Sequence, residues 1–174
     1  ILDSARSSNI PGIFLDPGPF KTKLDEAAET RYTDVLISAG VEWVVLAGFM
    51  RILNGRFLKT FHHRVINIHP SLLPSFKGLN THERAIKSGV KFAGCTVHLV
   101  RSGVDEGPII GQAITSIDIN DDKISLAEKV LKLEHKLYPK CLKLFTDKLV
   151  KVKDNKIIFS DKAIEVLNDL FRYH

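Results

Sequence analysis

Cysteine is scarce in this 174-residue sequence, and long apolar runs are missing from it. Its two cysteines, Cys95 and Cys141, lie far apart and belong to no CxxC or histidine-rich motif. This pattern excludes a disulfide framework and a metal site built on cysteine, and it makes a reducing cytoplasm the expected compartment. No apolar run approaches the length needed to cross a bilayer, so we expect no membrane association.

The sequence also lacks an arginine-rich arm, a zinc finger and the aromatic signature of an RNA-binding module. Its formal net charge of +5 favours anionic ligands, but the basic residues are dispersed as on an ordinary solvated surface. A nucleic-acid partner is therefore a weaker explanation of the charge than a small anionic ligand. The 44% of hydrophobic residues are enough for a core, and the length predicts one domain over residues 1–174.

Helical and strand patterns alternate through the first half of the chain. Helices are predicted at residues 24–39, 55–61, 81–88, 125–147 and 164–171, and strands at residues 13–15, 42–47, 64–69, 94–100 and 109–117. Pro139 falls inside the longest helix and is expected to kink or split it. Residues 149–152 and 156–159 predict an antiparallel hairpin. This order predicts an α/β fold with a doubly wound, mostly parallel sheet and a C-terminal hairpin at or near its edge.

Two polar residues end the apolar strand predicted at residues 64–69. Side chains two apart on a strand share a face, so Asn67 and His69 project together. An amide donor beside an imidazole suits chemistry at a carbonyl, where one group holds an oxyanion and the other moves protons. The alternative is a strand end with two polar residues facing solvent. Ligands of such sheets bind beyond the carboxyl ends of strands, where Phe49 and Asp105 are also expected, and this favours a site.

Five stretches in order along the chain resemble one family as a set. They are VVLAGFMRIL at residues 44–53, NIHPSLLP at 67–74, GLNTH at 78–82, GCTVH at 94–98 and VDEGP at 104–108. The sequence is similar to glycinamide ribonucleotide formyltransferases, which move a formyl group from 10-formyltetrahydrofolate to the amine of glycinamide ribonucleotide in purine biosynthesis. The resemblance implies a Rossmann-like formyltransferase fold over nearly the whole chain, with no metal.

The resemblance makes Asn67, His69 and Asp105 the catalytic group. The substrate amine would attack the formyl carbon directly, and Asn67 and protonated His69 would donate hydrogen bonds to the resulting oxyanion. A nearby Asp105 carboxylate would favour the charged imidazole of His69. His69, or a water held by Asp105, would then relay the proton from the amine to the folate nitrogen. No covalent enzyme intermediate is needed, in agreement with the lack of a Ser or Cys nucleophile elbow.

The resemblance also implies two sets of binding residues. The folate is expected to bind at Lys23, Met50, Arg51, Ile52, Leu53, Arg101, Val104 and Asp105. The acceptor substrate is expected to bind at Gly48, Phe49, Met50, Pro70 and Glu134, the last as a ligand of ribose hydroxyls. Ordinary strand-to-helix packing would also account for residues 50–53, and a solvated helix start would account for Lys23. His98 and His82 match family positions too, and His98 is expected to be structural.

Two departures from the family concern the acceptor's phosphate. The family often has a phosphate-binding lysine three residues before the glutamate, where this chain has Leu131, so Lys129 or Lys132 would have to substitute. The family also opens with a strand and a Gly-Asn-Gly-Ser-Asn loop, which this sequence lacks. We expect that this segment belongs to the protein but is absent from the sequence because it is disordered. The alternative is a truncated chain that binds its acceptor poorly.

Other functions remain open at this point. Formyltetrahydrofolate hydrolase shares the Asn-x-His pair and the aspartate, and it uses water in place of the amine. Methionyl-tRNA formyltransferase carries an additional C-terminal barrel, for which this chain has no length. A non-catalytic folate- or nucleotide-binding module would bind the donor without turnover. Monomer and homodimer are both compatible with the sequence.

Overall fold

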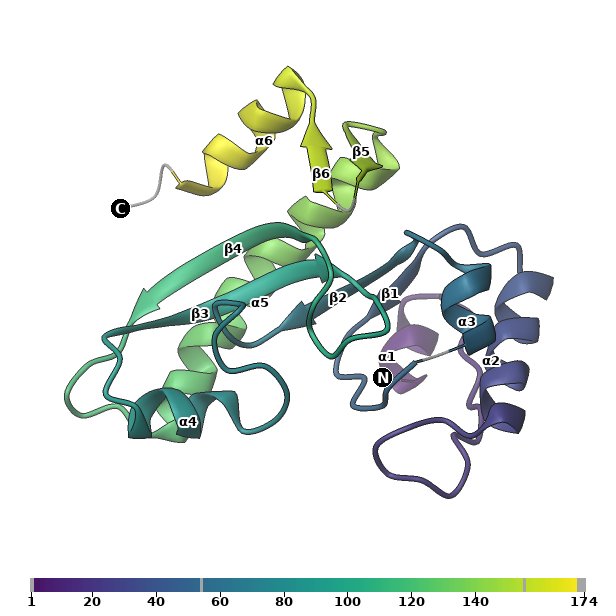
Figure 1. Ribbon diagram of the computed structural model, residues 1–174, viewed down its shortest axis with the longest axis horizontal. Helices are drawn as coiled ribbons and strands as arrows, with labels where there is room; N and C mark the ends of the chain where they lie inside the picture. Colours follow the sequence, from purple (N-terminus) through teal and green to yellow (C-terminus); the bar gives the residue numbers. More distant parts are fainter. Residues whose placement is uncertain (1, 54, 155, 172–174) are drawn as a thin grey trace.

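The computed structural model describes residues 2–53, 55–154 and 156–171 (Figure 1). Its helices are α1 (Leu2–Ser7), α2 (Glu26–Ser38), α3 (Gly55–Thr60), α4 (Thr81–Lys87), α5 (Lys123–Thr146) and α6 (Asp161–Phe171). Its strands are β1 (Val44–Leu46), β2 (Val65–His69), β3 (Phe92–Leu99), β4 (Ile109–Ser116), β5 (Val150–Lys153) and β6 (Lys156–Phe159). The α/β class and the C-terminal hairpin are therefore as predicted.

The main sheet has the strand order β1-β2-β3-β4. β1 and β2 are parallel, with Leu46 paired with Asn67. β3 runs antiparallel to β2, with Asn67 opposite His98 and His69 opposite Thr96. This register brings polar side chains from two neighbouring strands together near the carboxyl end of β2.

Strand direction is where the sheet differs from the prediction. A mostly parallel sheet was expected, and the observed sheet is mixed: only β1 and β2 are parallel, while β3 is antiparallel to both β2 and β4. The connection from β3 to β4 covers only residues 100–108, which is too short for a crossover helix and therefore requires an antiparallel pair. The hairpin of β5 and β6 forms a separate two-stranded sheet instead of extending the main one.

Two hydrophobic cores meet at β2. The larger core includes Ile66, Leu99 and Leu126 and lies between the sheet and α5. The smaller core includes Phe57 and Val65 and is covered by α2 and α3. Figure 1 shows α5 crossing β3 and β4, with α2 and α3 beside β1. Because successive strand residues point to opposite faces, the neighbours Val65 and Ile66 enter different cores.

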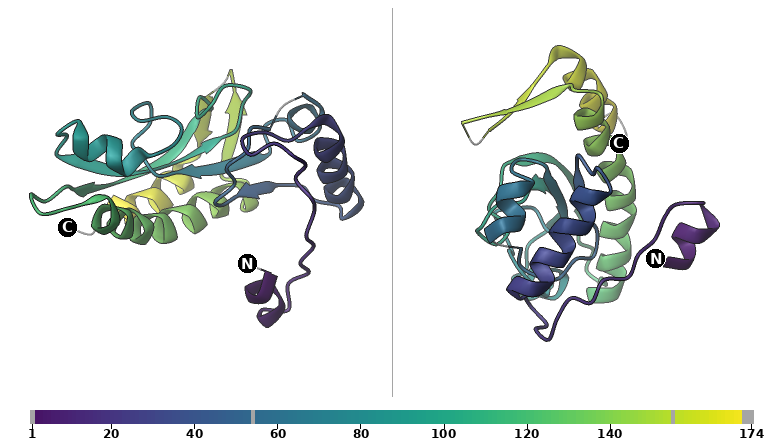
Figure 2. Two further views of the ribbon diagram at one scale, coloured as in Figure 1. Left: turned by 90° about the horizontal axis from the view of Figure 1, so that it is seen from below. Right: turned by 90° about the vertical axis from the view of Figure 1, so that its right-hand side faces the viewer.

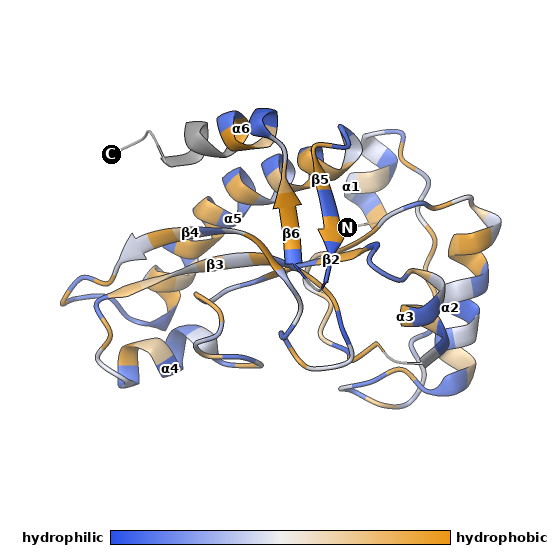
Figure 3. Cartoon of the chain, turned by 45° about the horizontal axis from the view of Figure 1, so that its top comes forward, coloured by the Kyte–Doolittle hydropathy of each residue, from blue (hydrophilic) through white to orange (hydrophobic). Residues whose placement is uncertain are grey.

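The long amphipathic helix predicted near the C-terminus is α5. Asp122 caps it by accepting hydrogen bonds from the backbone N–H groups of Ile124 and Ser125. Figure 3 shows hydrophobic and hydrophilic residues alternating along it. Its buried stripe consists of Leu126, Val130, Leu137, Cys141, Leu144 and Phe145. Pro139 lies inside this single helix and does not split it, because burial of the stripe against the sheet supports both halves.

Tyr138 of α5 ties the helix to the ends of two strands. Its hydroxyl oxygen lies 2.7 Å from the Leu46 carbonyl oxygen and 3.0 Å from that of Ile66. Burial raises the pKa of Tyr138, so the hydroxyl keeps its proton and can donate it to either carbonyl. The contact fixes β1 and β2 to α5 just before Gly48 and Asn67, two of the predicted site residues.

The strand predicted at residues 13–15 is wrong. This segment has no regular structure, and Phe14 is 75% exposed. Figure 2 shows α1 and the segment after it reaching away from the sheet. Residues 13–15 pair with no strand in the part of the chain that the structure describes, and the Leu15 carbonyl oxygen instead accepts a hydrogen bond of 3.0 Å from the Tyr32 hydroxyl. A β-prone segment without a neighbouring strand does not form a stable strand.

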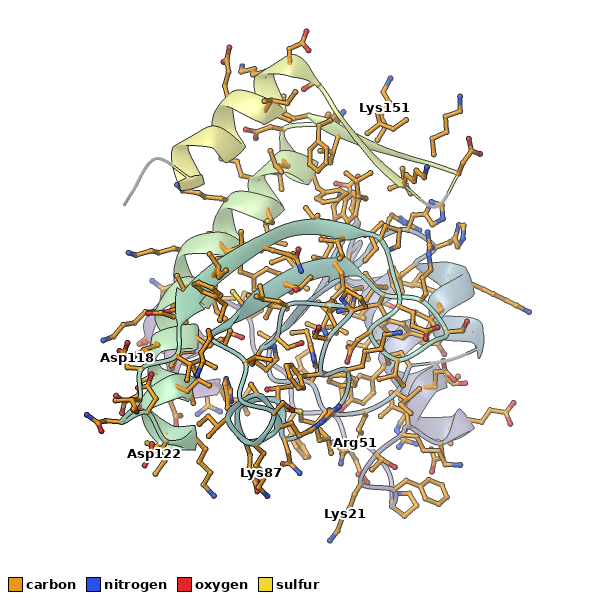
Figure 4. All side chains as sticks on the ribbon, turned by 60° about the vertical axis from the view of Figure 1, so that its left-hand side comes forward. Lys21, Arg51, Lys87, Asp118, Asp122 and Lys151 are labelled. Carbon is orange, nitrogen blue, oxygen red and sulfur yellow. The ribbon has the colours of Figure 1, made fainter. Side chains whose placement is uncertain are left out.

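Charged side chains project from separate elements over the surface. Figure 4 labels Lys21 ahead of α2, Lys87 at the end of α4 and Lys151 on β5, with Asp118 and Asp122 ahead of α5. The three lysines come from different parts of the fold, as the dispersed pattern in the sequence predicts. Within the described ranges, no helix is both long enough and apolar enough to cross a membrane.

Candidate active site

The predicted pair Asn67 and His69 lies at the carboxyl end of β2 on the face shared with Val65. Val65 is buried under α2 and α3, whereas Asn67 and His69 line a pocket. The smaller core thus ends where polar side chains begin, and the same strand face continues into the pocket. Alternation along β2 gives this placement directly, as the sequence pattern predicted.

Asp105 reaches the same place from the loop between β3 and β4. Its backbone has a φ of +52°, in the left-handed region that aspartate tolerates better than most residues. The loop lies close to β3: a Cβ added at Gly107 would come within 1.6 Å of the Leu99 carbonyl oxygen. Only glycine fits at position 107, two residues after Asp105.

The Asp105 carboxylate contacts three groups. Oδ2 lies 3.3 Å from His69 Nδ1 and accepts a hydrogen bond of 2.9 Å from the backbone N–H of Gly78. Oδ1 lies 3.6 Å from His98 Nε2. The Asp105 side chain is only 12% exposed, so these contacts replace most of its solvent. One carboxylate is therefore shared by two imidazoles and a loop amide.

His69 is held at both ring nitrogens. Nδ1 faces the Asp105 carboxylate, and Nε2 lies 3.1 Å from the Phe76 carbonyl oxygen. A carboxylate and a carbonyl can only accept hydrogen bonds, so both contacts suit a ring with a proton on each nitrogen. To donate to a substrate oxygen, His69 Nε2 would have to exchange its contact with Phe76.

Asn67 makes a contact that the sequence did not predict. Its Nδ2 lies 3.3 Å from Nε2 of His98, a residue of β3 that is only 2% exposed. His98 Nδ1 lies 2.9 Å from the Leu99 carbonyl oxygen. Burial lowers the pKa of His98, with the contact to Leu99 and the nearby Asp105 opposing this effect. A neutral His98 can accept one N–H of Asn67, leaving the second N–H on the pocket side.

The pocket has a volume of about 560 Å³, within the range of small-molecule sites. The predicted site residues that line it are Gly48, Phe49, Met50, Arg51, Ile52, Leu53, Asn67, His69, Pro70, Arg101, Val104 and Asp105. The structure thus brings residues of three separate loops and of β2 together around one pocket. The side chains of Met50 and Val104 are exposed on its wall, at 66% and 48%.

Two predicted binding residues do not line this pocket. Lys23 pairs with Ile52 through an isolated parallel bridge, and its ammonium lies 4.7 Å from the Phe20 ring centroid. Glu134 is half-buried on α5, where burial raises its pKa. Lys129, one substitute considered for the missing phosphate lysine, forms ion pairs with Asp118 and with Asp121, the latter at 2.6 Å.

Two histidines of the pocket lining were not assigned to the catalytic group from sequence. His98 matches a family position and lies beside Asn67, a contact that follows only from the pairing of β3 with β2. His82, in the first turn of α4, has a buried Nε2 with no hydrogen-bond partner among the described residues. Burial, with a smaller effect of His69, lowers the pKa of His82.

A metal site is not formed by the residues described. In the ranges 2–53, 55–154 and 156–171, no group of three or more His, Cys, Asp or Glu side chains could hold an ion. Around Asn67 the pocket lining brings together an amide, imidazoles and one carboxylate, and these groups suit hydrogen bonding and proton transfer at a carbonyl.

An α/β sheet with its pocket at the carboxyl ends of β1 and β2 defines the broad class of this chain. A family model described as Formyl transferase matches residues 2–142. The human Trifunctional purine biosynthetic protein adenosine-3 is 40% identical over 154 residues, covering 88% of this chain and 15% of that protein. The chain therefore belongs to the formyl transferase family, and it spans only about 15% of the length of this relative.

Solved structures agree with this assignment. Glycinamide ribonucleotide transformylase 1 from Symbiobacterium toebii has a TM-score of 0.86 at 38% identity, with 92% of this chain and 74% of that chain covered. A formyltetrahydrofolate deformylase from Pseudomonas syringae has a TM-score of 0.84 at 30% identity, with 91% of this chain and 52% of that chain covered. The fold is therefore shared by a protein named as a transformylase and by one named as a deformylase.

Proposed function

We propose that this chain transfers a formyl group from 10-formyltetrahydrofolate to the amine of glycinamide ribonucleotide, the phosphoribosylglycinamide formyltransferase reaction of purine biosynthesis. The observation that carries the proposal is the convergence of Asn67, His69 and Asp105 on one pocket of a formyl transferase chain. The similarity to the Symbiobacterium toebii transformylase supports the choice of acceptor.

In this proposal the substrate amine attacks the formyl carbon and a tetrahedral oxyanion forms. The pocket-side N–H of Asn67 donates to that oxyanion. A protonated His69 supports it with a second hydrogen bond once Nε2 leaves the Phe76 carbonyl, 3.1 Å away. Asp105 stabilises the charge on His69 from 3.3 Å and assists the proton on its way from the amine to the leaving nitrogen of the folate.

The donor would occupy the side of the pocket formed by residues 50–53 and the loop 100–108. The exposed Met50, Ile52 and Val104 offer apolar contact for the faces of a fused ring. Backbone N–H and C=O groups of these loops suit the donors and acceptors on the edge of a pterin. Arg51 and Arg101 supply positive charge on the same lining, which suits the carboxylates of the folate tail.

The acceptor would enter on the side of Gly48, Phe49 and Pro70, which also line the pocket. Glu134 lies outside the lining and is proposed to reach only a distal part of the substrate, its ribose hydroxyls. Lys132 remains the proposed phosphate contact on α5, because Lys129 is already paired with two aspartates.

Formyltetrahydrofolate hydrolysis is the second candidate function. The similarity to the Pseudomonas syringae deformylase supports it, and the same Asn67, His69 and Asp105 would activate water in place of an amine. A formyl-transfer assay with 10-formyltetrahydrofolate separates the candidates when it is run with and without glycinamide ribonucleotide. We expect release of the folate product to depend on the amine. Equal turnover in water alone would support the hydrolase, and folate binding without turnover would contradict both.

A further inference from the structure

We propose that His98 is a positioning residue: it accepts a hydrogen bond from the Asn67 amide and so keeps the second N–H of that amide directed into the pocket. The inference rests on the proposed function in one respect, namely that Asn67 donates to the oxyanion. The arrangement of His98 and Asn67 stands on geometry alone. This arrangement is supported by three contacts of the His98 ring, with Leu99, Asn67 and Asp105, and by the burial of that ring.

The backbone contact fixes one ring nitrogen. His98 Nδ1 lies 2.9 Å from the Leu99 carbonyl oxygen, which can only accept. Nδ1 must therefore carry a proton. The ring is then either the neutral tautomer with its lone pair on Nε2, or the doubly protonated cation.

The other ring nitrogen faces two groups of opposite character. Asn67 Nδ2, at 3.3 Å, can only donate, whereas Asp105 Oδ1, at 3.6 Å, can only accept. Neutral His98 would accept from Asn67, and charged His98 would turn to Asp105. The ring is 2% exposed, and burial disfavours its charged form. The shorter of the two contacts is also the one that the neutral ring can make.

Charge balance at Asp105 leads to the same assignment. One carboxylate lies between two imidazoles, at 3.3 Å from His69 and 3.6 Å from His98. It can compensate one positive charge, and a second imidazolium would be repelled by the first. Both nitrogens of His69 face acceptors, which is the pattern of the charged ring. His98 is therefore the member of the pair that stays neutral.

Strand pairing makes His98 a rigid support. Asn67 and His98 are direct partners in the antiparallel ladder of β2 and β3. Every residue of β3 except the first, Phe92, is buried. A side chain on such a strand has little freedom to follow the amide if it rotates. Without His98, the Asn67 amide could turn over and present its oxygen to the oxyanion, which replaces a donor with a repelling acceptor.

The decisive comparison uses His98→Ala, His98→Gln and, as a matched control, His62→Gln. The glutamine variant can still accept from Asn67 through its side-chain oxygen, whereas the alanine variant cannot. His62 is exposed, outside the pocket lining, and stacks on His63 with ring centroids 3.7 Å apart. We expect kcat to fall about 10- to 100-fold in His98→Ala, with KM within about threefold of wild type. His98→Gln should recover at least about fivefold of that loss in kcat, and the control should match wild type.

Nitrogen-15 NMR of the histidines in the wild-type protein provides a readout that does not depend on activity. We expect the neutral tautomer protonated at Nδ1 for His98 at about pH 7.5. A ring protonated at Nε2, unchanged kcat in His98→Ala, or no recovery in His98→Gln would each overturn the inference. If His98→Ala does not fold, the inference is still tested by the NMR tautomer of His98 in the wild type and by the kcat of His98→Gln. Absence of formyl transfer in the wild type would instead refute the proposed function, and the NMR result would then judge the His98–Asn67 arrangement separately.

Discussion

Replacement of Asn67 gives the sharpest test of the oxyanion role. Asn67→Ala removes the pocket-side N–H, and loss of one such donor typically costs about 100- to 1,000-fold in kcat, or about 2.7–4 kcal/mol. Asn67→Asp keeps the shape of the side chain but places a carboxylate where the amide donated. That carboxylate would face the Nε2 lone pair of His98 at about the present 3.3 Å and would repel the oxyanion. We therefore expect the aspartate variant to be no better than the alanine variant.

The effect on stability should be small by comparison. The contact with His98 is the hydrogen bond that the structure gives the Asn67 side chain, and such a bond contributes about 0.5–1.5 kcal/mol. Thermal unfolding would therefore show folded variants with slightly lowered Tm. This contrast between a large kinetic loss and a small stability loss separates a catalytic role from a structural one.

The assay is steady-state formyl transfer from 10-formyltetrahydrofolate to glycinamide ribonucleotide, with folate affinity measured separately by titration. Asn120→Ala, on an exposed turn ahead of α5, is the matched control and should retain wild-type kcat. A loss of less than about tenfold in Asn67→Ala, or about 1.4 kcal/mol, would refute the oxyanion role. So would an aspartate variant that is clearly more active than the alanine variant.

Three further outcomes follow from the geometry. Gly107→Ala would place a Cβ 1.6 Å from the Leu99 carbonyl oxygen, so the loop that carries Asp105 must shift. We expect kcat to fall about tenfold or more and urea unfolding to show a loss of about 1–3 kcal/mol in the free energy of unfolding. Burial raises the pKa of Cys95 and of Cys141 to about 12, so mass spectrometry should find both unmodified by iodoacetamide until denaturant is added. Burial lowers the pKa of His98 below its ordinary 6.5, so the unfolded chain binds a proton that the folded chain does not. The free energy of unfolding should therefore be highest above pH 6.5 and fall as the pH drops through 6.5, with a smaller slope in His98→Gln, as urea titrations at several pH values would measure.

The sequence predicted where Asn67 and His69 lie on their strand better than it predicted the direction of the strands around them. Alternation along β2 was enough to place Asn67 and His69 on one face, because the period of a strand does not depend on its partners. Strand direction depends on the length of the connections and on which strands pair with each other. The pattern of apolar residues indicates neither. The antiparallel pairing of β3 with β2 therefore changed the predicted sheet, and it alone brought His98 against Asn67.

Long side chains were the other limit of prediction. Lys23 and Glu134 were placed in the binding sets through resemblance, yet neither lines the pocket. An exposed lysine has several possible local partners, and here the ammonium of Lys23 lies over the Phe20 ring.

The strand predicted at residues 13–15 was wrong because a β-prone segment forms a strand only when a neighbouring strand satisfies its backbone groups.

The position of β2 between two cores limits how this chain can vary in length. Val65, Asn67 and His69 belong to one face of the strand, while Ile66 and Ile68 pack with the larger core on the other. A single inserted or deleted residue ahead of Asn67 would exchange the two faces, burying the polar pair among apolar side chains and turning isoleucines into the pocket. The strand can therefore accept substitutions, but it cannot accept a change in length. Insertions and deletions among members of the family should spare this strand and collect in exposed connections such as the turn before α5.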